Sequence, residues 1–256
     1  MHELTCCLPY EIVEMITAHL AEDLDTLKAC SLTCRSWYTA AAPHIHHTLI
    51  LRGSVFGLFR SSSDTLSSLH ELGLTPLVKE IRVIHSGDTC GWFRPEVFTA
   101  SDLLSFSTFN NVRTLSIHGL DIDRFMPVME RYFLQFSPIL RSISLYRPTS
   151  GAPQRLSYFL SLFPNLDDVD IRQPSFPDAP IPETELVPFT TPKLRGKLTL
   201  YDFSMIETWT HLIAICGVLQ FRGMELCRVE GCTPILLEAS AETLETLRLY
   251  VPGNAC

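Results

Sequence analysis

The stretch Leu140–Leu145 reads LRSISL, and the stretch Val112–Ile117 reads VRTLSI. Each begins with an apolar residue and, after a gap of two residues, continues with two apolar residues that one polar residue separates. Related copies occur at Leu166–Ile171, Leu194–Leu200 and Leu244–Leu249. Because side chains alternate between the two faces of a strand, this pattern predicts one short strand per copy, with one face buried.

Together with a weaker copy that ends at Leu226, these copies recur every 23 to 29 residues, counted between their last apolar positions. Weaker copies occur at Ile81–Val83 and Met224–Leu226. The segments from 123 to 136 and from 155 to 163 have apolar residues at helical spacing. The period resembles that of leucine-rich repeats, in an irregular form, since most copies lack the asparagine of the longer consensus. The resemblance implies a curved parallel sheet in a solenoid of strands and helices.

The N-terminal segment has a different pattern. Ile12, Ile16 and Leu20 lie four residues apart, which is typical of the apolar stripe of a helix. Pro9 fits the first turn of that helix, because the N–H that proline lacks has no partner there. We therefore expect a first helix shortly after residue 8.

Two more short helices are expected before residue 50. Asp25 is well placed to cap a helix that begins near Thr26. A third helix follows Arg35, and Pro43 should stop it because proline disfavours helical geometry in the residue before it. Isolated helices of this length are marginal in water, so we expect a small three-helix bundle.

The N-terminal motif elements match the F-box family almost position by position. They are LPYEI at Leu8–Ile12, the central Leu27, CSL at Cys30–Leu32 and CRSW at Cys34–Trp37. Residues 8 to 49 therefore resemble an F-box, a bundle that in this family inserts between helices of a Skp-type adaptor, which links it to a cullin and a RING ligase. F-box proteins often carry leucine-rich repeats as their substrate-binding part. The order seen here is similar to that of the large fungal F-box families.

The resemblance implies an adaptor-binding surface made of Leu8, Pro9, Ile12, Leu27, Leu32, Cys34 and Trp37. The alternative is that the same residues only fill the core of the bundle, since apolar periodicity shows burial without identifying what covers it. So small a bundle has more apolar residues than it can cover, which favours an interaction surface.

Residues between the apolar pairs should point away from the core. One column of them reads Ser116, Ser144, Asp170, Thr199, Glu225 and Arg248, and the next reads His118, Tyr146, Arg172, Tyr201, Cys227 and Tyr250. Tyr and Arg are enriched at binding hot spots, so Tyr146, Arg172 and Tyr201 are the candidate substrate-binding residues. The alternative is a solvated sheet face on which Tyr simply has good strand propensity.

The predicted fold class is therefore α + α/β, an F-box followed by an irregular leucine-rich-repeat solenoid. We expect the F-box at residues 5–50, a linker at 51–76 with a short helix around Leu66 to Leu72, and the repeat domain at 77–256. The last copy ends without the polar cap that a solenoid normally needs, which indicates a shortened or truncated member.

Two local segments are expected to lie at the surface. The proline-rich span between Asp178 and Pro192 should be an exposed loop on the rim of the solenoid. The cluster of His44, His46 and His47 lacks a partnered Cys pair at zinc spacing, which favours surface histidines over a metal site.

Composition excludes several classes of partner. The formal net charge is −8 and the sequence has no basic run, which argues against nucleic acid. The sequence has no run of about 18 apolar residues, which is the length that a membrane-spanning helix requires. Nine irregularly spaced cysteines and the absence of a secretion signal indicate a reducing compartment, cytoplasmic or nuclear. No motif for a cofactor or a catalytic centre is present, so neither cofactor nor metal is expected.

The sequence thus predicts a non-catalytic substrate-recognition adaptor of an SCF-type (Skp-cullin-F-box) ubiquitin ligase, with an unidentified protein substrate. One alternative is an F-box interaction scaffold that acts outside a ligase. A remote alternative is a cysteine-dependent hydrolase that uses Cys90 or Cys227 with a nearby histidine, although the sequence provides no such pairing.

Overall fold

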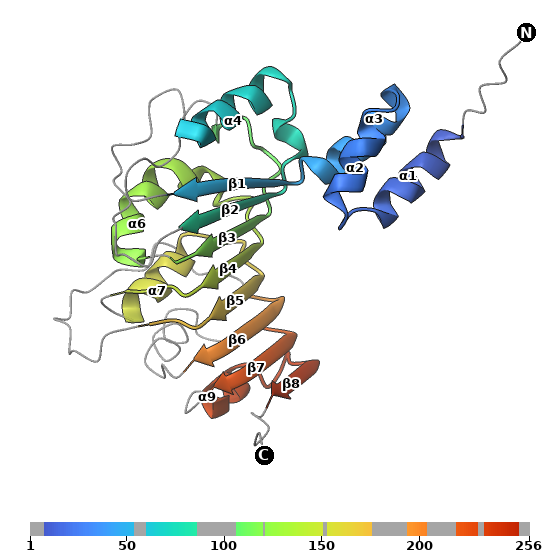
Figure 1. Ribbon diagram of the computed structural model, residues 1–256. Coiled ribbons are helices and arrows are strands. Elements are labelled where there is room, and N and C mark those ends of the chain that lie inside the picture. Colours follow the sequence, from blue (N-terminus) through green and yellow to red (C-terminus); the bar gives the residue numbers. More distant parts are fainter. Residues whose placement is uncertain are drawn as a thin grey trace, which may run out of the picture.

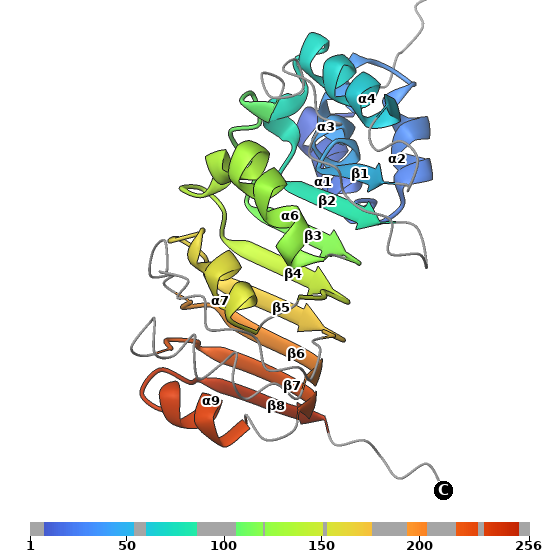
Figure 2. The same cartoon turned by 90° about the vertical axis from the view of Figure 1, so that its left-hand side faces the viewer.

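A bundle of three helices lies beside an eight-stranded sheet in the computed structural model (Figure 1). The structure describes residues 8–53, 60–85, 106–119, 121–150, 153–175, 194–203, 219–229 and 233–250. The bundle consists of α1 (Tyr10–His19), α2 (Leu24–Ser31) and α3 (Arg35–Ile45). The other helices of the described chain lie on one face of the sheet (Figure 2).

The N-terminal bundle forms because α1 and α2 each cover part of α3. Val13 and Thr17, one turn apart on α1, are buried, and so is Leu27 of α2. From α3 the buried side chains are the small ones of Ala40–Ala42. The predicted stripe of Ile12, Ile16 and Leu20 is therefore not the buried face of the helix, since Ile12 is exposed and Ile16 and Leu20 are only half-buried.

The second helix begins earlier than predicted, and its cap is Asp23 instead of Asp25. The Asp23 carboxylate accepts hydrogen bonds from the backbone N–H of Thr26 at 3.0 Å and from the Thr26 hydroxyl at 2.7 Å. An N-cap side chain reaches the N–H three residues ahead, and Asp25 lies already inside the first turn, where it pairs with Lys28 at 3.7 Å.

The third helix does not stop at Pro43, as the sequence predicted, but continues through it to Ile45. Proline lacks the N–H that would bond to the carbonyl four residues earlier. The helix tolerates that loss because Pro43 lies in its last turn, which the backbone N–H of His46 closes by bonding to the Ala42 carbonyl at 2.9 Å.

All eight strands of the sheet are parallel and follow one another in chain order. They are β1 (Thr48–Gly53), β2 (Glu80–His85), β3 (Thr114–His118), β4 (Ser142–Tyr146), β5 (Asp168–Arg172), β6 (Lys197–Phe203), β7 (Gly223–Val229) and β8 (Thr246–Tyr250). Each predicted copy of the apolar pattern forms one of these strands. Parallel neighbours need a crossover between them, and helices or long segments provide it here.

Two apolar rows run across the sheet in register. The first is Leu49, Ile81, Leu115, Ile143, Val169, Leu198, Met224 and Leu247, and the second is Leu51, Val83, Ile117, Leu145, Ile171, Leu200, Leu226 and Leu249. From β1 to β7 every one of these side chains is buried. The strand β8 differs, because Leu247 and Leu249 are 42% and 55% exposed.

Helices cover the face of the sheet to which these rows point (Figure 2). They are α4 (Arg60–Glu71), α6 (Ile122–Val128), α7 (Pro153–Ser161) and α9 (Thr233–Ala239), with short 3₁₀ segments at Thr75–Leu77 and Leu134–Phe136 and a π turn at Met129–Phe133. The helical segments predicted for 123–136 and 155–163 are confirmed. The short helix expected around Leu66 to Leu72 is the end of the longer α4.

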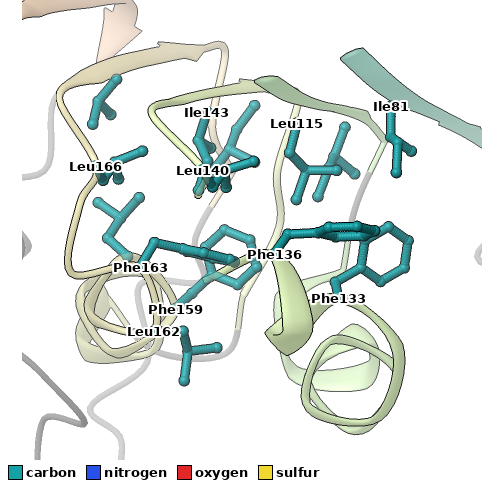
Figure 3. Packing of buried hydrophobic residues seen from close by; sticks show 14 of the residues in the cluster. Ile81, Leu115, Phe133, Phe136, Leu140, Ile143, Phe159, Leu162, Phe163 and Leu166 are labelled. Atoms are coloured by element: carbon teal, nitrogen blue, oxygen red, sulfur yellow. The ribbon is translucent and has the colours of Figure 1, made fainter. Parts of the chain in front are cut away.

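Phenylalanines fill the space between helices and sheet (Figure 3). Phe133 and Phe136 point from their helical turns toward Leu115, and Phe159 and Phe163 point from the region of α7 toward the next strands. All four are at most 2% exposed. Burial of such side chains stabilises the fold by roughly 1.5–3 kcal/mol each, so this layer anchors the sheet.

A left-handed backbone conformation recurs at or near the carboxyl ends of β3 to β7. The residue that follows the second column has a positive φ in each case, and these residues are Gly119, Arg147, Gln173, Asp202 and Arg228. Four of the five are not glycine, and such residues adopt this conformation at a cost of about 1 kcal/mol or more. The same backbone conformation thus recurs at five in-register positions of the sheet.

The boundary predicted between F-box and linker falls inside a strand. Residues 51–53 belong to β1, which pairs with β2 along its whole length, so the sheet starts before the expected linker. The sequence reading missed β1 because its copy of the pattern lies directly after the F-box motif. The proline-rich span from Asp178 to Pro192 lies outside the described residues. Within the described residues, no helix has both the length and the apolar character to cross a bilayer.

Candidate functional site

The N-terminal bundle exposes a cluster of large apolar side chains. We call it the apolar N-terminal surface, and its members are Leu8, Tyr10, Ile12, Met15, Leu24, Leu32 and Tyr38, each 39–87% exposed. Seven of the thirteen exposed large apolar residues in the described chain lie in this bundle. Because more than half of the exposed large apolar residues of the described chain lie on this one small bundle, the bundle is the first candidate interaction site.

Most of the predicted adaptor-binding residues lie at the surface of the bundle. Leu8, Ile12 and Leu32 are 48%, 40% and 87% exposed. Pro9 and Cys34 are also exposed, whereas Trp37 is half-buried.

Leu27 is the exception, because it is 0% exposed and fills the core between the helices. Its prediction as a surface residue is therefore corrected. The side chain of Leu27 points into the core of the bundle, whereas that of Leu32 does not.

Sequence reasoning missed four members of the apolar N-terminal surface, which are Tyr10, Met15, Leu24 and Tyr38. The sequence did contain a signal for Met15. Leu8, Ile12 and Met15 are spaced by four and three residues, which is a second apolar stripe on the first helix. A helix with two apolar stripes can bury only one of them within its own small bundle.

Cys34 lies at the start of α3 in extended geometry, directly before the helix. The pKa of the Cys34 thiol is lowered, mainly by the backbone N–H of Trp37, because a hydrogen-bond donor near the sulfur stabilises the thiolate. Partial desolvation of the thiol acts in the opposite direction. The thiol is exposed, and its neighbours in the described chain that affect the pKa are Thr33, Ser36 and Trp37.

The face of the sheet opposite the helices is the second candidate site. The two predicted columns lie in register across β3 to β8, so that His118, Tyr146, Arg172, Tyr201, Cys227 and Tyr250 are neighbours on consecutive strands. We call this side the open face. Tyr146 and Tyr250 are 39% and 46% exposed, and Arg172 is exposed as well.

The three predicted substrate-binding residues are brought together on β4, β5 and β6. The Arg172 guanidinium lies 4.9 Å from the centre of the Tyr201 ring, a cation–π arrangement. Tyr146 pairs with Arg172 in register, and its ring lies 5.5 Å from that of His118. Desolvation lowers the pKa of His118, and the charge of Arg82 adds to that effect while Glu80 opposes it.

Carboxylates hold the aromatic and cationic side chains in place. Asp170 accepts hydrogen bonds from Nε and Nη2 of Arg172 at 2.8–3.1 Å, which raises the pKa of the guanidinium. Glu225 accepts from the Tyr201 hydroxyl at 2.8 Å and from Lys197. These fixed geometries reduce the side-chain entropy that binding would cost.

The sequence placed Glu225 in the first column but did not identify Lys197, or the contact of Glu225 with Tyr201. The hydrogen bond from Lys197, and then that from Tyr201, lowers the pKa of Glu225. Conversely, the hydrogen bond to Glu225 raises the pKa of the Tyr201 hydroxyl, so Tyr201 remains a neutral donor. No sequence signal links Lys197 and Glu225, since they meet only through the pairing of β6 with β7.

A second polar network lies where the sheet meets the bundle. Glu80 accepts hydrogen bonds from Thr48 at 3.0 Å, from Arg82 at 3.0 and 3.3 Å and from Ser116 at 2.8 Å, so it ties β1, β2 and β3 together. Partial burial raises the pKa of Glu80, but the hydrogen bonds from Ser116, Arg82 and Thr48 outweigh it, and the net pKa is lowered.

Other chemistry finds little support in the described part of the chain. No group of three or more His, Cys, Asp or Glu side chains there could hold a metal ion. His44 and His46 lie in or at the end of α3, and desolvation lowers the pKa of His46. Cys227 is half-buried in β7, and Cys90 lies outside the described residues.

Comparison with known proteins identifies the N-terminal bundle. A family model described as F-box-like matches residues 5–52, which include all three helices and most of β1. No curated protein matches the chain. Domains of this kind generally bind Skp-type adaptors. The chain therefore contains an F-box-like domain, formed by α1, α2 and α3, joined directly to a sheet of eight parallel strands.

Proposed function

We propose that this protein is a substrate-recognition adaptor of an SCF-type ubiquitin ligase. The apolar N-terminal surface would bind the Skp-type adaptor and, through it, the cullin and the RING ligase. The observation that carries this proposal is the exposure of seven large apolar side chains on an F-box-like bundle. The protein itself is non-catalytic, since a ligase of this kind works by holding its substrate in place.

We further infer that the sheet domain consists of irregular leucine-rich repeats, as in the fungal-type F-box families. The parallel strands in chain order, the two apolar rows and the recurring turn geometry support this inference. The open face would then bind the substrate protein with Tyr146, Arg172 and Tyr201. Such a protein would act in the cytoplasm or the nucleus.

Co-expression with a Skp-type adaptor tests the first part of the proposal. We expect a stable one-to-one complex by size-exclusion chromatography, and co-purification of cullin from cells. Leu32→Asp should abolish the complex because it places a charge at the most exposed position of the apolar N-terminal surface. Leu72→Asp is the matched control, since Leu72 is also well exposed, at 69%, but follows α4 outside the bundle.

The result separates the proposal from its alternatives. If the adaptor does not bind, or if Leu32→Asp binds as well as Leu72→Asp, the proposal is wrong. If the adaptor binds but cullin is absent from the purified complex, the protein is an F-box scaffold that acts outside a ligase.

The open face is tested by replacing Tyr146, Arg172 and Tyr201 together with alanine. Proteins captured by the wild-type complex should be lost from the variant complex, while adaptor binding and the thermal unfolding midpoint stay close to wild type. Arg131→Ala, on the helical side of the sheet, is the control. Unchanged capture by the triple variant would rule out this binding face.

A further inference from the structure

Basic residues gather along the edge at which the strands begin. Lys79, Arg113, Arg141, Arg195 and Arg222 each lie one or two residues before a strand, and they make up five of the twenty Lys and Arg residues of the chain. Backbone hydrogen bonds of 2.8 Å run from Arg113 to the Lys79 carbonyl and from Arg141 to the Arg113 carbonyl. These three residues therefore occupy equivalent positions on neighbouring strands. We call this set the basic edge.

The arginines of the basic edge are held in fixed positions. Nη1 of Arg113 donates to the Ile139 carbonyl at 2.9 Å, and Nη1 of Arg141 donates to the Asn165 carbonyl at 3.1 Å. Each guanidinium is thus anchored on the backbone of the following segment. Since arginine has five N–H donors, this anchor leaves further donors for a ligand and reduces the entropy that binding would cost.

Much of the charge on this edge is not neutralised within the described chain. Lys79, Arg113 and Arg195 are exposed and form no ion pair with a described carboxylate. Arg141 forms an ion pair at 3.6 Å with Asp167, whose side chain is 33% exposed, and Arg222 forms one at 3.9 Å with the exposed Glu245. The part of the basic edge without an intervening carboxylate position is the run Lys79, Arg113 and Arg141 before β2, β3 and β4, which Asp167 ends before β5.

We propose that the basic edge binds an extended, acidic polypeptide segment. Adjacent strands lie about 4.8 Å apart, so Lys79 to Arg141 spans about 10 Å, the length of roughly three extended residues. Carboxylates on alternate residues of such a segment would meet the guanidinium groups, which bind carboxylates in a two-pronged geometry.

A polypeptide fits this edge better than a nucleic acid does. Single-stranded nucleic acids use aromatic side chains as stacking platforms, and none belongs to the basic edge. The uninterrupted basic run is also short, because Asp167 and Asp168 stand at the start of β5, and it therefore suits a short acidic segment better than a long phosphate backbone. The inference is independent of ligase recruitment, since it concerns only the edge of the sheet.

The test uses the full chain and a fluorescein-labelled peptide of ten glutamates, with fluorescence anisotropy as the readout. We expect binding at low salt that weakens as salt rises, because exposed charges are screened. The double variant Lys79→Gln with Arg113→Gln should weaken binding about fivefold. The matched control is Lys28→Gln with Arg131→Gln, which changes the net charge equally but on other surfaces.

Each outcome decides the proposal. Retained binding by the control together with weakened binding by the double variant supports it, provided that both unfold at the wild-type temperature. Absence of peptide binding, or equal weakening in both variants, overturns it. Tighter binding of a ten-nucleotide single-stranded RNA than of the glutamate peptide would also overturn it.

Discussion

Leu27 and Leu32 lie five residues apart in one family motif, yet their environments are opposite, with exposed fractions of 0% and 87%. Leu27→Ala should lower the free energy of unfolding by about 2–3 kcal/mol, because it leaves a cavity in the bundle. Leu32→Ala should change that energy by less than about 0.5 kcal/mol and yet weaken binding of the Skp-type adaptor. Urea unfolding followed by circular dichroism, together with calorimetric titration of the adaptor, distinguishes the two roles. Similar stability losses in both variants would contradict the assignment.

Glu80 links three strands through hydrogen bonds to a carboxylate that is 13% exposed. Its lowered pKa means that the folded state favours the charged form. The stabilisation is therefore present above the ordinary carboxyl pKa of about 4.5 and disappears as the pH falls through the lower, folded-state value. Glu80→Gln should cost about 1–2 kcal/mol at pH 7, and the difference from wild type should shrink below pH 4.5. Thermal unfolding from pH 7 to 3, with exposed Glu242→Gln as control, measures this effect.

The start of β6 depends on a glycine. A Cβ at Gly196 would lie 2.0 Å from Oδ1 of Asp168, the atom that accepts the backbone N–H of Lys197 at 2.6 Å. In Gly196→Ala the Asp168 side chain would have to turn away, and the lost hydrogen bond should cost about 1 kcal/mol. The measurement is the free energy of unfolding of Gly196→Ala. The double variant Asp168→Ala, Gly196→Ala should be no less stable than Asp168→Ala alone; an additional loss would place the strain elsewhere.

β8 is the last strand of the sheet, and both of its apolar side chains are exposed. Exposed apolar edge strands favour association with other chains. Replacing Leu247 and Leu249 with threonine should therefore reduce concentration-dependent association while changing the thermal unfolding midpoint little. Light scattering over a concentration series gives the answer, with Leu32→Thr as a comparison that removes a different exposed leucine. Unchanged association in the β8 variant would show that this edge is not responsible.

The apolar patterns of the sequence predict where β2 to β8 and the three N-terminal helices form, whereas the parallel direction of the strands was expected only through the resemblance to leucine-rich repeats. Periods of 2 and 3.6 residues and a repeat of 23–29 residues are local properties that a chain displays without its fold. The packing of distant segments determines that Leu27 is covered while Leu32 is not, and that residues 48–53 form the first strand of the sheet. It also determines that Lys197 and Glu225 support Tyr201. Burial and hydrogen bonding depend on neighbours that are distant in sequence, and no local pattern specifies which of two apolar stripes a small bundle will cover.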